Sequence, residues 1–417
     1  MGESQSLELR APVARRIAER LKAGAAPDEG IELFTAGRDR WLKALSRDLE
    51  DVADGDAKLR IFNGRYGDGK THLMKLTRHM ALSGGFVTAY VPISKDVPLS
   101  NWSALYRGLV QSLQTAGRPN QRGLGAVLDP NDRDPAIAAG FDAKAESVRS
   151  LTSLHPDFLT AIYRFTTIQG TSVDTAADLL TLRSWFEGQP VARRVLTPLG
   201  ISRAIEKQDG PRMLQSLVGV LRHFGFAGLL LLIDEVESIL SQRSSAVRAV
   251  AYENLRLFID RDVLPTHCLA VFSTTPEMFS APQEGFQSYP ALWSRIRPPN
   301  SHGAIDYRAT IVDLPKTPPT SDDFSTIGRR IREIHQIGYG WSAHDQVPDD
   351  YIAAAARLAS SGELALTYSP TRVFVKLMAE ELDLANQSSE YVADPSPLRR
   401  RFQAVDEALD KDVEQWS

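Results

Sequence analysis

Residues 59–76 read LRIFNGRYGDGKTHLMKL, and the architecture of the chain follows from them. The first part is apolar over the length of a strand, and Leu73, Leu76 and Met80 are spaced for one face of a helix. Between them, GRYGDGKT at 64–71 fits the pattern GxxxxGK[ST]. A strand, a glycine-rich turn and a helix in this order predict a P-loop, which presents backbone N–H groups to phosphate oxygens.

The residue types in this loop suit the binding of a nucleoside triphosphate. Glycines let the backbone turn tightly, Lys70 could reach the β- and γ-phosphates, and the Thr71 hydroxyl could ligate Mg²⁺. The alternative is a glycine-rich turn that binds nothing, and the flanking strand and helix make it the weaker interpretation. The predicted nucleotide-binding residues are Gly64, Arg65, Tyr66, Gly67, Asp68, Gly69, Lys70, Thr71 and His72.

Two acids follow a second apolar run, in FGFAGLLLLIDEVE at 224–237. The run is continuously apolar, as expected for a strand that is buried on both faces of a parallel sheet. Beside a P-loop, Asp234 would complete the Mg²⁺ shell through water, and Glu235 could polarise the attacking water. The pair favours hydrolysis over kinase-type transfer. The alternative is an acidic strand end that faces solvent.

Hydroxyl and guanidinium groups further along the chain are candidates for phosphate contacts. VFSTTPEM places Ser273, Thr274 and Thr275 after an apolar strand, at the end that faces the ligand crevice of a parallel sheet. Thr274 is slightly favoured, and a helix N-cap is the alternative function. Arg295, Arg297 and Arg372 could stabilise charge on a transferring phosphoryl group, with ordinary ion pairs as the alternative.

Composition predicts a globular cytoplasmic protein. Its 417 residues suffice for two domains. The net charge of −4 argues against a surface that coats nucleic acid, although it leaves a local basic groove open. The single cysteine, Cys268, excludes an internal disulfide and is expected to fill the core. No run approaches the ~18–20 apolar residues of a membrane span, so no membrane contact is predicted.

Strand and helix patterns alternate along most of the chain, which predicts an α/β fold with a parallel sheet flanked by helices. Strand patterns lie in GDAKLRIFNG at 55–64, at 86–93, in GLLLLIDEVE at 228–237, at 268–275 and near 305–312. Residues 95–215 are expected to be an insertion, with helices around 142–165, 174–187 and 201–207. After a Pro-rich connector, residues 321–338, 348–360, 370–385 and 396–414 have helical patterns. The predicted domains are a core at 1–318 and a helical domain at 319–417.

These motifs and their order resemble the AAA+ ATPases. More closely, the chain resembles the ATP-binding proteins of bacterial BREX phage-defence systems, the BrxC/BrxD group, which are relatives of origin-recognition-type ATPases. The resemblance rests on ELFTAGRDRWLKAL at 32–45, RIFNGRYGDGKTHLMKL at 60–76 and FGFAGLLLLIDEVESIL at 224–240. It implies a P-loop NTPase core with a C-terminal helical lid over the nucleotide.

The resemblance also implies a role for each candidate residue. Gly37 and Arg38 match a motif that contacts adenine. Lys70 and Thr71 would be Walker A, and Asp234 and Glu235 would be Walker B. Thr274 falls at sensor 1, Arg372 falls at sensor 2 in the lid, and Arg295 or Arg297 would be an arginine finger given to a neighbouring subunit.

The function so implied is Mg²⁺-dependent ATP hydrolysis within a cytoplasmic anti-phage complex. Expected partners are further copies of this chain and other defence proteins. DNA is a further candidate partner, through the core, the insertion or Arg399, Arg400 and Arg401, although three arginines in a helix more often form a solvated face. The leading alternative is a nucleotide-gated scaffold with little turnover. A kinase activity is a weaker hypothesis. GTP is disfavoured as the nucleotide because no [NT]KxD base-recognition motif is present.

Overall fold

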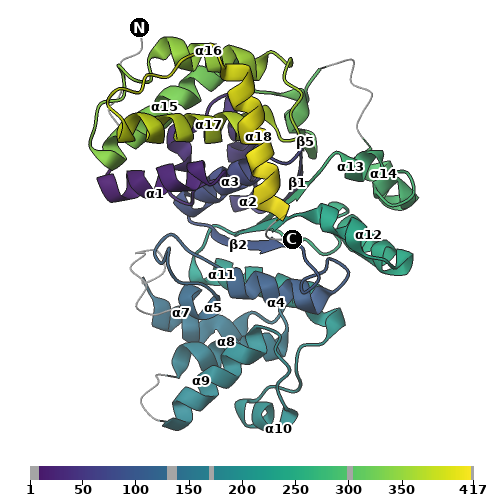
Figure 1. The fold of residues 1–417 in the computed structure, drawn as a ribbon. Coiled ribbons are helices and arrows are strands. Elements are labelled where there is room, and N and C mark those ends of the chain that lie inside the picture. Colours follow the sequence, from purple (N-terminus) through teal and green to yellow (C-terminus); the bar gives the residue numbers. More distant parts are fainter. Residues whose placement is uncertain (1–8, 129–138, 169–172, 298–303, 415–417) are drawn as a thin grey trace. The chain divides into compact units, whose positions relative to one another are not determined.

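The computed structural model describes four stretches of the chain, residues 9–128, 139–168, 173–297 and 304–414 (Figure 1). The chain forms two compact units, and each unit combines segments that are distant in the sequence. The first unit comprises residues 1–42, 63–76 and 313–417, and the second comprises residues 43–62 and 77–312. The predicted domain boundary near residue 319 stays a prediction.

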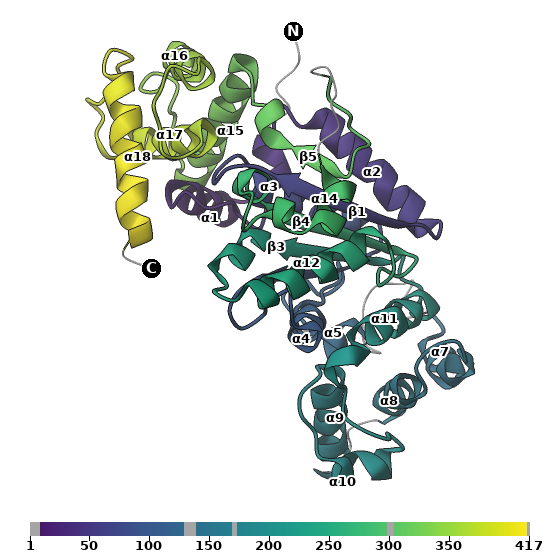
Figure 2. The ribbon, with the colours of Figure 1, turned by 90° about the vertical axis from the view of Figure 1, so that its right-hand side faces the viewer.

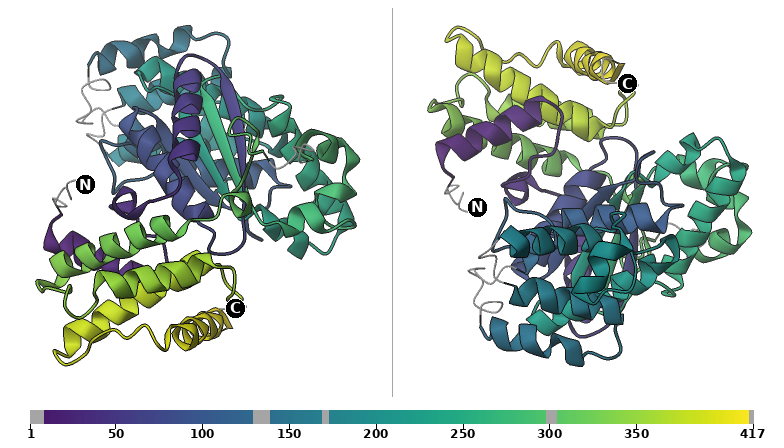
Figure 3. Two further views of the ribbon diagram at one scale, coloured as in Figure 1. Left: turned by 90° about the horizontal axis from the view of Figure 1, so that it is seen from above. Right: turned by 90° about the horizontal axis from the view of Figure 1, so that it is seen from below.

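The second unit is built on a five-stranded sheet with the strand order β2-β3-β4-β1-β5. In chain order the strands are β1 (Ala57–Asn63), β2 (Val87–Pro92), β3 (Leu229–Asp234), β4 (Cys268–Thr274) and β5 (Ile311–Asp313). β3 pairs in parallel with β2 and with β4 (Figure 3, left). Every residue of β3 and of β4 is buried, as expected for central strands covered on both faces. A strand is present near each of the five predicted places, although the last covers only Ile311–Asp313 and not the whole of the predicted 305–312. The prediction that Cys268 fills the core is confirmed.

Helices cover both faces of this sheet. They are α2 (Asp39–Ala53), α3 (Lys70–Ser83), α4 (Trp102–Ser112), α11 (Gly210–Phe224), α12 (Ser245–Ile259), α13 (Glu277–Ser280) and α14 (Pro290–Ile296). Figure 2 shows α2 on one face and α4 with α11 on the other. A buried ion pair attaches α2 to β1, because Arg60 Nε donates to Asp48 Oδ2 at 2.6 Å and Arg60 Nη2 donates to Asp48 Oδ1 at 3.0 Å. Such a bidentate pair fixes orientation as well as distance.

The predicted insertion is helical and belongs to the same core as the sheet. Its helices are α5 (Leu124–Val127), α7 (Phe141–Ser147), α8 (Pro156–Thr167), α9 (Val173–Phe186) and α10 (Arg193–Leu196). Phe158 and Trp185 from these helices share one apolar cluster with Leu231 of β3. The helix predicted at 142–165 is interrupted between α7 and α8. The helix predicted at 201–207 is wrong, because these residues form an irregular segment closed by a capping box between Glu206 and Asp209.

The first unit is helical apart from its connecting segments. It contains α1 (Ala11–Lys22), α15 (Ser321–Tyr339), α16 (Asp349–Ser360), α17 (Pro370–Gln387) and α18 (Leu398–Glu414), together with the segments around the P-loop sequence. The four predicted C-terminal helices are present. α18 buries Leu398, Phe402, Val405 and Leu409, which lie on one face at a helical spacing. None of the described helices is long and apolar enough to cross a membrane.

Candidate functional site

The P-loop sequence connects the end of β1 at Asn63 to the start of α3 at Lys70. Gly67 has a φ of +90° and Gly69 has a φ of +96°, a region that side chains with a Cβ rarely adopt. The loop is closed by its own aspartate, because the Arg65 N–H donates to Asp68 Oδ2 at 2.7 Å and the Asp68 N–H donates to the Arg65 carbonyl at 3.2 Å. The glycines and Asp68 therefore set the curvature of the loop.

The ammonium group of Lys70 is folded back onto this loop. Lys70 Nζ donates to the Gly64 carbonyl at 2.6 Å and to the Arg65 carbonyl at 3.3 Å. It also lies 5.1 Å from the centre of the Tyr66 ring, a cation–π distance. Thr71, in the first turn of α3, is exposed. The positive charge of Lys70 and the amino end of the 14-residue helix α3 thus lie at the same loop. Both favour the binding of an anion there.

Arg38, in the segment before α2, forms a hydrogen bond with the P-loop sequence. Its guanidinium is buried and donates through Nη2 to the Asp68 carbonyl at 3.2 Å and through Nη1 to the Thr317 carbonyl at 2.6 Å. Gly37, immediately before it, lies against the carboxylate of Asp323. Burial lowers the pKa of Arg38, and Asp68 and Asp323 oppose that effect. The structure therefore brings the predicted adenine-contacting residues Gly37 and Arg38 next to the predicted phosphate loop.

His72 is held as a neutral imidazole in a defined tautomer. The Thr35 hydroxyl donates its single proton to the Ile31 carbonyl at 2.8 Å, so it accepts from His72 Nε2, also at 2.8 Å. The ring of Phe34 packs edge-on against the imidazole, with ring centres 5.3 Å apart. Burial, together with the charges of Arg38 and Lys75, lowers the pKa of His72 to about 4. His72 thus ties α3 to the N-terminal segment without carrying charge at neutral pH.

We expect His72 to make the chain less stable in mild acid. An unfolded histidine has a pKa near 6.5 and the folded one has a pKa of about 4, so the unfolded state binds more protons between these values. The free energy of unfolding should therefore fall as the pH falls, by about 2 kcal/mol between pH 7 and pH 5. Denaturant titrations at several pH values should show that the free energy of unfolding depends less steeply on pH in His72→Gln than in the wild type. His79→Gln, at an exposed position of the same helix, should retain the wild-type slope.

Arg372, near the start of α17, approaches the P-loop sequence closely. A side chain at Gly67 would bring its Cβ to 2.7 Å from the Cβ of Arg372, so only glycine allows this approach. Beside it, the Ser369 N–H donates to the Tyr66 carbonyl at 3.3 Å. The Arg372 Nε is buried and has no hydrogen-bond partner among the described residues, and its guanidinium lies 5.0 Å from the ring centre of Tyr368. The guanidinium is thus positioned by packing, with an unused donor.

In the second unit, Asp234 at the end of β3 is held by three donors. The Tyr90 hydroxyl donates to Asp234 Oδ2 at 2.8 Å, and the Glu235 N–H donates to Oδ1 at 3.0 Å. The Ser273 hydroxyl also donates to Oδ1. Glu235 itself is exposed and adopts a left-handed φ of +59°. A glutamate in that region is strained, and such strain occurs frequently at functional positions. Asp234 is therefore fixed in orientation, and the strand ends at Asp234, so that Glu235 is the first residue beyond it.

Thr274 and Thr275, at and after the end of β4, are buried. Neither hydroxyl has a hydrogen-bond partner among the residues that the structure describes. Ser273, one residue earlier, is the β4 side chain that binds Asp234. The sequence predicts Ser273 at this strand end, but not its contact with Asp234. It does not single out Tyr90 on β2, because nothing in a strand pattern shows which residue of a neighbouring strand a side chain will contact. The predicted role of Thr274 stays a prediction, supported by its unused hydroxyl.

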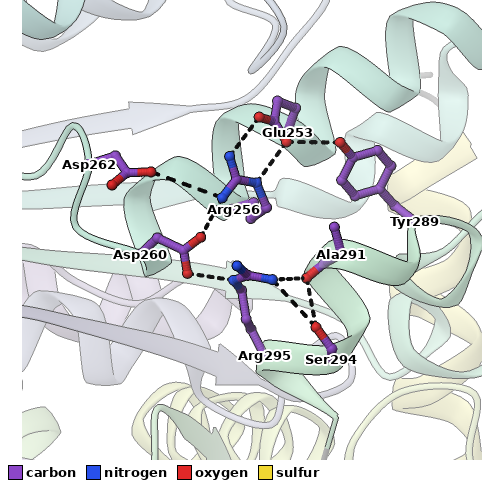
Figure 4. Close-up of polar contacts among 8 residues, drawn as sticks. All are labelled: Glu253, Arg256, Asp260, Asp262, Tyr289, Ala291, Ser294 and Arg295. Carbon is purple, nitrogen blue, oxygen red and sulfur yellow. Dashed lines mark hydrogen bonds and ion pairs between the residues drawn. The ribbon is translucent and has the colours of Figure 1, made fainter.

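The two arginines around the end of α14 differ in their surroundings. Arg295 donates through Nε to Asp260 Oδ1 at 2.5 Å and through Nη1 to the Ala291 carbonyl at 2.6 Å (Figure 4). Asp260 is also bound by Arg256, which pairs in turn with Glu253. Hydrogen bonds from Arg256 and Tyr289 lower the pKa of Glu253 to about 2. Arg295 is thus part of an intramolecular ion network, whereas Arg297 is exposed just beyond the helix.

Comparison with known families gives one match over most of the chain. The family described as "BREX system ATP-binding protein BrxC/D" matches residues 10–396. The matched range includes the P-loop sequence, Asp234, Glu235 and Arg372, and it ends just before α18. A search of curated proteins finds no match.

Proposed function

The chain belongs to the family of BREX system ATP-binding proteins BrxC/D, and on this basis we propose that it binds ATP with Mg²⁺ and hydrolyses it in anti-phage defence. The sequence resemblance predicts this family, and that prediction is confirmed. The matched description names ATP binding. We propose hydrolysis, dependence on Mg²⁺ and partner binding from the residues of the chain.

One observation supports ATP binding above all others. The ammonium of Lys70 is held against the carbonyls of Gly64 and Arg65 at the amino end of α3, in a loop whose glycines have positive φ. A phosphate chain is the ligand class that this combination of a point charge, a helix end and a tight loop favours. Arg38 and Arg372, which both contact the loop, add positive charge beside it. We propose that ATP binds along this loop.

The oxygen groups predicted for Mg²⁺ have the chemistry that this ion requires. Mg²⁺ prefers oxygen ligands and is commonly held by one or two side chains together with substrate phosphates and water. The exposed hydroxyl of Thr71 is available at the first turn of α3. The carboxylate of Asp234 is held by three donors, which leaves part of its capacity of about four acceptor positions. When bound, the ion would neutralise charge that builds on the β- and γ-phosphates.

Glu235 is the residue proposed to act on water. The residue is exposed and has a left-handed backbone at the end of β3, next to the fixed carboxylate of Asp234. A carboxylate can accept a proton from, or orient, a water that attacks the γ-phosphate. The buried hydroxyl of Thr274, which has no partner within the described ranges, would contact the same phosphate or water. These assignments follow the sequence prediction for Asp234, Glu235 and Thr274.

Assembly and partner binding are proposed from the arginines that remain exposed and from membership of the family. A guanidinium supplied in trans requires an oligomer of this chain, and Arg297 is the better candidate because Asp260 and Ala291 occupy the guanidinium of Arg295. A DNA contact through Arg399–Arg401 would depend mainly on Arg400. Arg399 pairs with Glu363, and Arg401 pairs with the buried Glu381. Membership of the family supports other defence-system proteins as partners.

We expect phosphate release from ATP that requires Mg²⁺ and stops when EDTA is added. The physical reason is that the charge on the triphosphate is otherwise uncompensated during transfer. Purified protein would be assayed with ATP and Mg²⁺, with and without DNA, and in competition with GTP. Preferential inhibition by GTP would contradict the choice of ATP. ATP binding without turnover under all these conditions would contradict hydrolysis and would favour a nucleotide-gated switch.

A further inference from the structure

The last helix, α18, holds the segment that precedes α17. Asp406 of α18 is buried, and its carboxylate accepts two backbone N–H groups, from Thr367 at 2.7 Å and from Tyr368 at 2.9 Å. Residues 363–369, which connect α16 to α17, have no regular secondary structure. Bonds from N–H groups to a carboxylate are charge-assisted and stronger than neutral ones. Asp406 thus fixes a segment that no helix or strand would otherwise hold.

The same segment contacts the P-loop sequence on its other side. The N–H of Ser369 donates to the Tyr66 carbonyl at 3.3 Å, and the ring of Tyr368 lies 5.0 Å from the guanidinium of Arg372. The side chain of Ser369 also caps α17 by accepting from the Thr371 N–H at 3.3 Å. Three consecutive residues, 367–369, therefore connect the carboxylate of Asp406 to the loop and to the arginine beside it.

We propose that Asp406 is a positioning residue for nucleotide binding, which acts by holding residues 367–369 and so the guanidinium of Arg372 beside the loop. The inference rests on the proposed function, in which Arg372 contacts the phosphates of ATP. It adds a residue of α18, which lies beyond the matched range 10–396. The physical reason is preorganisation: a guanidinium that is already oriented loses less conformational freedom when the anion binds.

A purely structural anchor would behave differently. If Asp406 only attached α18 to the helices around it, its loss would lower stability, and its effect on nucleotide affinity would be independent of Arg372. If Asp406 acts through Arg372, the two residues are coupled. Mutation of Asp406 in a chain that already lacks the Arg372 guanidinium should then weaken ATP binding little further. A double-mutant cycle on ATP affinity distinguishes these cases because it measures the coupling itself.

The experiment uses the full chain and the fluorescence of a labelled ATP analogue. We expect Asp406→Asn, which can accept only one of the two N–H groups, to weaken binding roughly tenfold. Arg372→Ala should have at least as large an effect, and the double variant should bind no more weakly than Arg372→Ala. The matched control is Glu407→Gln, the same chemical change at the next, exposed position of α18, which should bind as wild type.

A second variant covers the case in which Asp406→Asn fails to fold, as judged by circular dichroism. Tyr368→Leu keeps the backbone N–H that Asp406 binds and removes only the ring beneath Arg372, so it should weaken binding and be coupled to Arg372→Ala in the same way. Wild-type affinity in Asp406→Asn, or effects of Asp406→Asn and Arg372→Ala that multiply in the double variant, would overturn the inference alone. A wild-type chain that binds no ATP would overturn both this inference and the proposed function.

Discussion

Lys70→Ala is expected to weaken ATP binding by at least about a hundredfold. In the structure the ammonium already sits against the loop carbonyls of Gly64 and Arg65, so it is in place to reach phosphate oxygens with a small movement. Each hydrogen bond to a charged group contributes about 1.5–3 kcal/mol, and loss of contacts to two phosphates therefore exceeds a factor of about one hundred. Equilibrium binding of labelled ATP measures this directly.

The control for Lys70→Ala is Lys43→Ala, which removes the same charge from an exposed position of α2. It should bind ATP as wild type does, because Lys43 is not part of the loop and its solvent-exposed charge is screened by salt. Equal affinity of wild type and Lys70→Ala would remove the P-loop sequence from the proposed site. Equal losses in the two lysine variants would show that net charge, and not the position of Lys70, controls binding.

Glu235→Gln is expected to leave ATP binding nearly intact and to reduce turnover by about 10²–10⁴-fold. A glutamine keeps the size of the side chain and loses the ability to accept a proton, and general-base catalysis contributes about that factor. Steady-state phosphate release, together with binding of labelled ATP, separates the two effects. The matched control is Glu277→Gln at an exposed position of α13, which should retain full turnover.

Glu235→Gly provides an independent check of the same position. The backbone of Glu235 has a φ of +59°, which glycine adopts without strain. The variant should therefore lose turnover as Glu235→Gln does, while its free energy of unfolding rises by up to about 1 kcal/mol. A gain in stability combined with a loss of activity would indicate that the left-handed backbone lowers stability at a position whose side chain is needed for turnover. Full turnover in either variant would exclude Glu235 as the group that acts on water.

The strands and the P-loop sequence could be predicted because their signals are local. A strand buried on both faces, such as β3, is apolar at each position, and a glycine-rich loop needs its glycines wherever it occurs. The helix predicted at 201–207 failed for the opposite reason. Its apolar spacing is helical, but the capping box between Glu206 and Asp209 starts the next helix instead, and Arg203 binds Asp209.

The sequence predicts a residue of the candidate site only where its type and its place in a motif are enough to identify its role. Lys70 and Asp234 carry their chemistry in the motif. Tyr90, which binds Asp234 from 144 positions away, becomes visible only when β2 pairs with β3. Likewise, the sequence does not distinguish Arg295 from Arg297 as the arginine finger, and only the fold shows that Asp260 binds Arg295. Asp406 gave no signal, because its partners are backbone groups nearly 40 positions earlier in the chain.

The burial of Cys268 has a practical consequence for spectroscopy. This single thiol lies inside β4 with no exposed surface, and burial raises its pKa, so it should not react with maleimide dyes while the chain is folded. Cysteines introduced at exposed positions can then be labelled selectively in the otherwise natural sequence. Leu180 in the second unit and Val392 in the first are both more than half exposed. A dye pair at these two positions would report by energy transfer on any movement between the units when nucleotide is added.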